Sequence, residues 1–187
     1  MGNRLARLRR TSNKTSSNTR NYSTRVDSEL EDRLMSLDPK SISSPPLKGN
    51  NTLARIVDVY DGDTVKALFF LNGLIDAPFK IGVRLAGIDC PELRTKNILE
   101  KKAGHVVRDF LRGVINNKIV ILNIHNWDKY GSRIVGDVYP PDSSRTVSDL
   151  LLSMNFAKPY DGKSKKEDWT DEELKRIIDS NDLVHIG

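Results

Sequence analysis

Residues 52–71 read TLARIVDVYDGDTVKALFFL and place Asp61-Gly62-Asp63 between two runs of β-prone residues. Branched and aromatic side chains are enriched in strands, and an Asp-Gly pair between two such runs is typical of a hairpin turn. We therefore predict antiparallel strands at 52–60 and 64–71, joined through this turn. Asn72-Gly73 follows directly and indicates a second turn.

Three further strands are expected after this hairpin. They are short runs of branched and apolar residues at 79–88, 118–124 and 132–139, and Pro140-Pro141 ends the last of them. Between the third and fourth strands, apolar residues recur at helical spacing over 97–114. This segment is therefore predicted to be a helix.

Two more helices are expected toward the end of the chain. Residues 147–154 carry apolar side chains on one helical face, and Thr170 with Glu173 forms the capping-box pattern of a helix start. Five short strands with a helix after the third predict an α+β domain, a five-stranded OB-type barrel packed with about three helices. The strand face of such a barrel commonly binds nucleic acid or sugar.

Residues 1–48 differ in composition from the predicted domain at 49–180. They are rich in Ser, Asn, Thr and Arg and poor in large apolar residues, so they are predicted to form a disordered basic tail. The tail is interpreted as a solvated extension, a nucleic-acid-binding arm or an organelle-targeting segment. Residues 1–26 hold seven basic side chains and no acidic one. The net charge of +5 therefore says little about the domain's own surface.

Composition also limits the class of protein. No run approaches the roughly 18–20 apolar residues that a membrane-spanning helix requires, so no membrane span is predicted. The single cysteine, Cys90, excludes an intrachain disulfide and favours a reducing intracellular compartment. We expect the protein to be a monomer.

Three carboxylates lie near predicted strand ends. Asp63 follows the tight turn, while Asp89 and Glu92 flank Cys90-Pro91. Such residues could meet in space and hold a hard divalent cation such as calcium, which accepts carboxylate and backbone carbonyl oxygens. Pro91 biases Cys90 toward an extended conformation that could aim its carbonyl at the metal. On the alternative interpretation, Asp61 and Asp63 only form the turn.

Two arginines are candidates for binding a phosphate. Arg84 lies inside an apolar strand, where an unpaired charge is costly, and Arg133 begins the last strand. Guanidinium groups offer planar donors that match phosphate oxygens. Arg84 and Asp89 are five residues apart, which puts them on opposite faces of an ideal strand. They can converge only if the strand bends or ends before Asp89, for which Gly87 is a plausible place.

These residues stand in three runs, VYDGDTV at 59–65, RLAGIDCPE at 84–92 and DKYGSR at 128–133. In order and spacing the runs resemble the staphylococcal nuclease family, and the resemblance covers about residues 52–160. One departure is Ser132, which lengthens the Tyr-Gly-Arg motif usual in the family. A bulge or a longer turn must absorb this extra residue if Arg133 is to reach the site.

The resemblance implies a role for each matched residue. Asp63 and Asp89 would be calcium carboxylates, and Cys90, usually Thr in the family, would supply a backbone carbonyl to the metal. Glu92 would position or deprotonate the attacking water. The remaining matches would contact the substrate: Arg84 and Arg133 the scissile phosphate and its transition state, Lys129 and Tyr130 the terminal phosphate of a bound nucleotide.

The resemblance also implies an activity. The family has an OB-type barrel and cleaves DNA and RNA on the 5′ side of the phosphodiester, which leaves 3′-phosphate ends. We therefore expect a calcium-dependent nuclease that acts preferentially on single-stranded DNA and RNA. The alternative is a catalytically inactive module of the same fold that binds nucleic acid or protein. The full set of matched acidic and arginine residues favours the enzyme.

The remaining chemically versatile residues are interpreted as structural. The three histidines, at 105, 125 and 185, are too scattered to indicate a metal site. Trp127 could stack on a base, but a place in the core or at its rim is the favoured interpretation.

Overall fold

The computed structural model describes residues 35–38, 47–70, 78–163 and 167–180. Nearly all of the predicted tail and the predicted Asn72-Gly73 turn lie outside these residues. The secondary-structure elements belong to one compact unit, Pro45–Gly187. The boundaries of the tail, 1–48, and of the domain, 49–180, stay a prediction.

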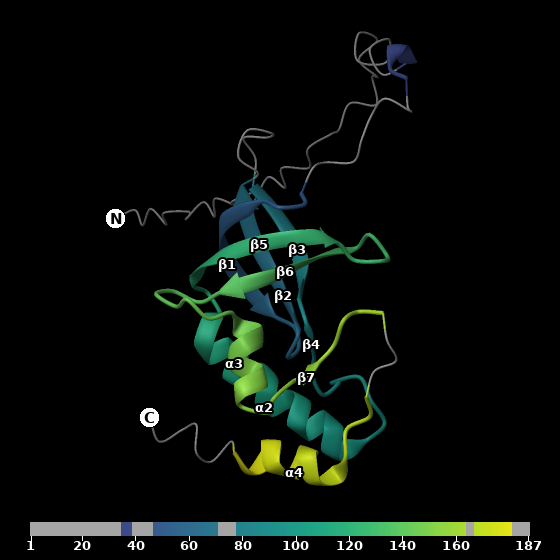
Figure 1. The fold of residues 1–187 in the computed structure, drawn as a ribbon, viewed down its shortest axis with the longest axis vertical. Helices are drawn as coiled ribbons and strands as arrows, with labels where there is room; N and C mark the ends of the chain where they lie inside the picture. The colour runs from purple at the N-terminus through teal and green to yellow at the C-terminus, as the bar shows by residue number, and fades with distance from the viewer. Residues whose placement is uncertain (1–34, 39–46, 71–77, 164–166, 181–187) are drawn as a thin grey trace, which may run out of the picture. The chain divides into compact units, whose positions relative to one another are not determined.

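Five strands form a closed barrel (Figure 1). Its strand order is β1-β2-β3-β6-β5, in which β3 and β6 run parallel and every other pair is antiparallel. Closure gives every barrel strand a partner on both sides, although β3 and β6 pair only through Gly82–Leu85 and Arg133–Gly136. The predicted five-stranded barrel is therefore confirmed. The strands are β1 (Asn51–Val59), β2 (Thr64–Phe70), β3 (Pro78–Leu85), β5 (Ile119–Trp127) and β6 (Arg133–Tyr139).

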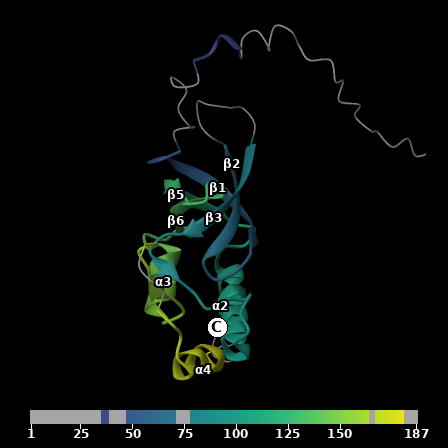
Figure 2. The same cartoon turned by 90° about the vertical axis from the view of Figure 1, so that its right-hand side faces the viewer.

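In the ranges that the structure describes, three helices accompany the barrel, and the sequence predicts each of them: α2 (Ile98–Ile115), α3 (Val147–Ser153) and α4 (Asp171–Asp179). Figures 1 and 2 show them gathered at one end of the barrel. The predicted capping box starts α4: Thr170 Oγ1 accepts the Glu173 N–H, and Glu173 accepts the Thr170 N–H. Among the described residues, no helix is long and apolar enough to span a bilayer.

The predicted strand at 79–88 is wrong at its C-terminal end. The strand β3 ends at Leu85, and the chain resumes as the two-residue strand β4 (Ile88–Asp89), which pairs with β7 (Lys158–Pro159). Gly87 makes the break, since its φ of 79° lies in the left-handed region that glycine adopts without strain. The turn is held from both sides, because Ala86 N–H donates to the Gly136 carbonyl and the Ala86 carbonyl accepts the Ser148 hydroxyl.

The fourth barrel strand along the chain, β5, is longer than the predicted 118–124. It continues to Trp127 because its pairing with β6 shifts register between Ile124 and Asn126 and then resumes. Such a bulge adds one residue to a strand and redirects the side chain at that point. The bulge falls at His125.

The tight packing of β5 against β6 yields a stability prediction. A Cβ added at Gly136 would lie 2.4 Å from the carbonyl oxygen of Asn123. Gly136→Ala is therefore expected to lower the free energy of unfolding by about 1–3 kcal/mol, as overpacking does. The matched control is Gly113→Ala in α2, where an added Cβ meets nothing within 4 Å. This control should gain about 0.5–1 kcal/mol from helix propensity. Urea denaturation measures both changes, and an unchanged midpoint for Gly136→Ala would contradict the packing described.

Candidate active site

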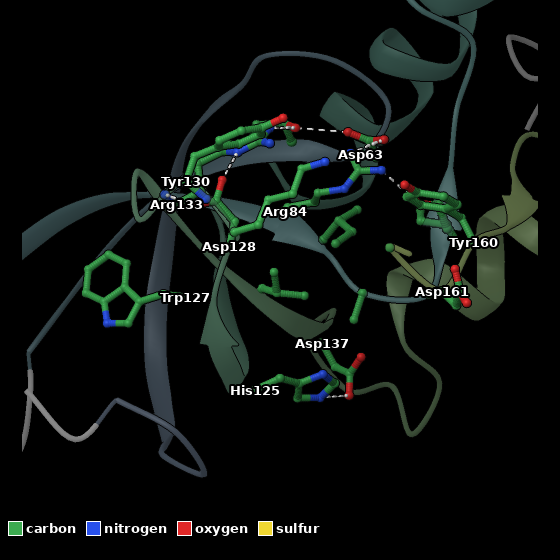
Figure 3. Close-up of a pocket in the computed structure, with 18 of the residues that line it drawn as sticks. Asp63, Arg84, His125, Trp127, Asp128, Tyr130, Arg133, Asp137, Tyr160 and Asp161 are labelled. Carbon is green, nitrogen blue, oxygen red and sulfur yellow. Dashed lines mark hydrogen bonds and ion pairs between the residues drawn. The ribbon is translucent and has the colours of Figure 1, made fainter. Parts of the chain in front are cut away.

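A pocket of about 720 Å³ opens beside the ends of β2, β3 and β6 (Figure 3). Most of the site residues expected from the sequence line it, namely Asp63, Arg84, Glu92, Lys129, Tyr130 and Arg133. The other two, Asp89 and Cys90, are buried and are not among the residues that line the pocket. The structure therefore brings together residues that lie up to 70 positions apart in the chain.

Arg84 joins two of the predicted carboxylates. Its Nη1 donates to Asp63 Oδ2 at 2.5 Å, and its Nη2 donates to Asp89 Oδ1 at 3.3 Å. The Arg84 side chain is only 17% exposed and both carboxylates 8%, so little water screens these contacts. Burial by itself would lower the pKa of Arg84, but the charges and hydrogen bonds of Asp63 and Asp89 outweigh it and raise the pKa. Arg84 is therefore a permanent cation held between two strands.

The reversal at Gly87 makes this arrangement possible. Because β3 stops at Leu85, the chain turns and returns Asp89 to the side of Arg84, and Arg84 Nη2 also donates to the Ile88 carbonyl at 3.2 Å. The bend expected near Gly87 is thus confirmed. Directly after β7, the ring of Tyr160 lies 5.7 Å from the Arg84 guanidinium carbon (Figure 3). Tyr160 and the neighbouring Asp161 line the pocket, and the sequence analysis did not identify them.

The loop before β6 accommodates the extra Ser132. Asp128 Oδ1 accepts the backbone N–H groups of Tyr130 and Ser132, and Gly131 adopts a φ of 66°. Arg133 Nε donates to Asp128 Oδ2 at 3.1 Å, so the same carboxylate organises the turn and orients the arginine. Burial would raise the pKa of Asp128, but the hydrogen bonds from Arg133 and Ser132 lower it. The additional residue thus lies in a turn that Asp128 organises, and the bulge at His125 lies in the same β5–β6 hairpin.

Thr64 links the two arginines and was not predicted. Its hydroxyl donates to Asp63 Oδ1 at 2.9 Å and accepts from Arg133 Nη1 at 3.2 Å. Asp63 in turn holds Arg84, so one hydrogen-bonded chain runs across the pocket from Arg133 to Asp89. Thr64 directly follows Asp63 in the sequence, but no local pattern reveals that it faces Arg133.

Asp61 forms the turn, as expected, and also contributes charge to the pocket. Its Oδ1 accepts the Asp63 N–H at 3.2 Å. Burial raises the pKa of Asp61 from 3.8 to about 6, and the negative charges of Asp63 and Glu92 add to this shift. These carboxylates therefore generate a negative potential that a bound cation would relieve.

The oxygen atoms near Arg84 are of the type that a hard cation such as calcium binds. In the described ranges, no three Asp, Glu, His or Cys side chains form a ready-made metal cluster. Asp63 and Asp89 nevertheless offer carboxylate oxygens close to a single guanidinium. Calcium completes its shell with backbone carbonyls and water, so two carboxylates with a carbonyl are a chemically reasonable set.

Cys90 can serve such a set only through its backbone. Its side chain is buried, and a Cβ on Gly62 would lie 2.7 Å from the Cys90 Cβ. Burial raises the pKa of the thiol well above its usual value, and the neighbouring aspartates reinforce this effect. The thiol is therefore protonated at neutral pH and shielded from solvent.

The pocket rim carries the last two predicted residues. Tyr130 is 73% exposed, and Lys129 Nζ lies 4.9 Å from its ring centroid. His125 and Trp127 line the same pocket, although the sequence analysis gave them structural roles. The roles assigned to individual site residues stay predictions.

Comparisons with known proteins find a matching family model and several similar proteins. A family model described as staphylococcal nuclease homologue matches residues 82–180. A probable endonuclease lcl3 from Penicillium rubens is 28% identical, over 70% of this chain and 52% of that protein. The corresponding protein of Aspergillus flavus is 26% identical, over 70% of this chain and 56% of its own length. Endonuclease Htp3 from Saprolegnia parasitica is 30% identical, over 57% of this chain and 54% of its own length. The chain spans about half the length of the curated relatives it matches.

The bridging role of Thr64 can be tested by substitution. Thr64→Val keeps the shape of the side chain but removes both hydrogen bonds, which should lower the free energy of unfolding by about 1–3 kcal/mol. Thr64→Ser keeps the hydroxyl and loses one methyl group, at about 0.8 kcal/mol. In denaturant unfolding, the free energy of unfolding should be lower for Thr64→Val than for Thr64→Ser. The reverse order would show that packing of the methyl group matters more than the bridge.

Proposed function

The chain belongs to the staphylococcal nuclease homologue family, and we propose that it is a calcium-dependent nuclease that hydrolyses phosphodiester bonds of DNA and RNA. The observation that supports this most directly is the pair of arginines, Arg84 and Arg133, bound through one hydrogen-bonded chain in a pocket that Glu92 also lines. The pocket thus holds fixed positive charge together with a candidate base.

The arginines are suited to bind and stabilise a phosphate. Asp63 and Asp89 hold Arg84, while Asp128 and Thr64 hold Arg133. Because these contacts fix both guanidinium groups before substrate arrives, little reorganisation is needed as charge builds up on the phosphoryl oxygens. Their planar donors match the geometry of a phosphate, which a lysine ammonium would not.

Glu92 is proposed to act on the attacking water. The water oxygen forms a bond to phosphorus, its proton passes to the Glu92 carboxylate, and the bond from phosphorus to the 5′ oxygen breaks. The leaving 5′ oxygen takes a proton from solvent, which gives a 5′-hydroxyl and a 3′-phosphate. Glu92 lines the pocket, and its backbone N–H donates to the Glu100 side chain at 3.2 Å, which ties it to the first turn of α2.

Asp63, Asp89 and the Cys90 carbonyl are the residues that would hold calcium. When bound, the ion supplies positive charge to the phosphate and favours ionisation of water. The exposed Lys129 and Tyr130 at the rim would contact a terminal phosphate of the substrate. We propose that a single strand is preferred, because its backbone can bend into a pocket beside the barrel more easily than a duplex can. We propose that the protein acts as a monomer.

The proposed activity is tested by cleavage of heat-denatured DNA and of RNA, with calcium and then with a chelator. We expect cleavage only with calcium, and Glu92→Gln should reduce kcat by about 10²–10⁴-fold, the usual contribution of a general base. Glu172→Gln, the same substitution on the exposed face of α4, is the matched control and should leave kcat unchanged.

Two results would contradict the proposal. Cleavage that persists in chelator would remove the metal from the account, and full activity of Glu92→Gln would remove the proposed base. Binding without cleavage under every condition would favour the alternative, a module that only binds nucleic acid.

A further inference from the structure

The strand β6 forms one wall of the pocket with alternate residues. Arg133, Val135 and Asp137 line the pocket, while the residues between them are buried in the barrel. A strand rises about 3.3 Å per residue, so the wall extends about 13 Å from Arg133 to Asp137. It changes along this length from a cation through an apolar side chain to an anion. The proposed phosphate site occupies only the end of this wall at Arg133.

A histidine pairs with the acidic end of this wall. The Nε2 atom of His125 lies 2.8 Å from Asp137 Oδ2, and the two side chains are 44% and 23% exposed. His125 stands at the bulge in β5, which redirects its side chain. In Figure 3 the pair lies across the pocket from Arg84 and Arg133. It therefore belongs to the pocket but is separate from the residues proposed to bind the phosphate.

The chemistry of the pair determines which ligand atoms it can accept. A carboxylate can only accept hydrogen bonds, so the proton of the bond lies on His125 Nε2. Asp137 retains a second carboxylate oxygen, and both of its oxygens act as acceptors whether or not His125 is charged. Within the described part of the chain, the bond between them is the only hydrogen bond that either side chain makes. The pair thus presents acceptors to the pocket.

The position of these acceptors points to a base. A second phosphate would be repelled by the negative charge of Asp137, whereas the amino group of a base would donate to it. Carboxylates accept in this way from the N4 amino group of cytosine. Thymine and uracil carry a carbonyl oxygen at the corresponding position, which would face another acceptor.

We propose that His125 and Asp137 form a base-reading subsite of the proposed nuclease that selects an amino-bearing base, cytosine above all, next to the scissile phosphate. This inference rests on the proposed function. The subsite makes the enzyme prefer strands rich in cytosine over strands rich in thymine or uracil. Its effect is on substrate choice, because among the residues that the structure describes the pair forms no hydrogen bond with either arginine or with Glu92.

The test compares oligo(dC) and oligo(dT) of equal length as substrates of the full chain with calcium. The native chain should show a higher kcat/KM for oligo(dC), by about 5- to 100-fold, the discrimination typical of one well-made base contact. Asp137→Asn replaces one carboxylate acceptor by an amide donor. It should bring the ratio of kcat/KM for oligo(dC) to that for oligo(dT) close to one, with oligo(dT) cleaved about as fast as by the native chain. Asp58→Asn, at a surface ion pair on β1, is the control for loss of one negative charge and should keep the native ratio.

The preference is also measured by binding, in a competition between oligo(dC) and oligo(dT) for the Glu92→Gln variant. This experiment does not require hydrolysis. If the native chain cleaves neither strand but binds oligo(dC) more tightly, the proposed function fails and the subsite stands. Equal or absent binding of the two strands overturns the subsite. An Asp137→Asn chain that loses both activities equally, or that changes only the preference for RNA over DNA, would also overturn base reading.

Discussion

The ion pairs of Arg84 with Asp63 and Asp89 are the contacts on which the site depends. Three charged side chains, each less than a fifth exposed, are brought out of water together. Any one of them alone would be costly to bury, since removing a partner from such a group typically costs about 3–5 kcal/mol. The contacts therefore require that the start of β2, the end of β3 and the strand β4 stay together. They fix the backbone around the pocket as well as the side chains.

The same hydrogen-bonded network also fixes the second arginine, Arg133. Asp63 accepts from Thr64, and Thr64 accepts from Arg133 at the start of β6. The parallel pairing of β3 with β6 sets the distance between the two arginines, because it places Arg133 opposite Gly82, two residues before Arg84. Both arginines are therefore positioned by contacts within the chain itself.

Local patterns predicted the parts of the structure that depend on neighbours in the chain. The hairpin at Asp61-Gly62-Asp63 and the capping box at Thr170 follow from residues within a few positions of each other. The bend at Gly87 was expected because Arg84 and Asp89 could not otherwise meet. Thr64 and Tyr160 were missed as site residues, since their contacts with Arg133 and Arg84 join segments far apart in the chain. The His125–Asp137 pair joins consecutive strands, but it was missed because it depends on the bulge in β5. Side-chain spacing within one strand gives no information about such contacts.

The most direct test of this account is the cleavage rate of Arg84→Lys on single-stranded DNA with calcium. Lysine keeps the positive charge but cannot bind two carboxylates and a phosphate with a planar set of donors. If the bridged guanidinium stabilises the transition state, kcat should fall by about 10²–10³-fold, the usual effect of removing one such donor. A rate within a few-fold of the native chain would contradict the central claim that Arg84, held by Asp63 and Asp89, carries the chemistry.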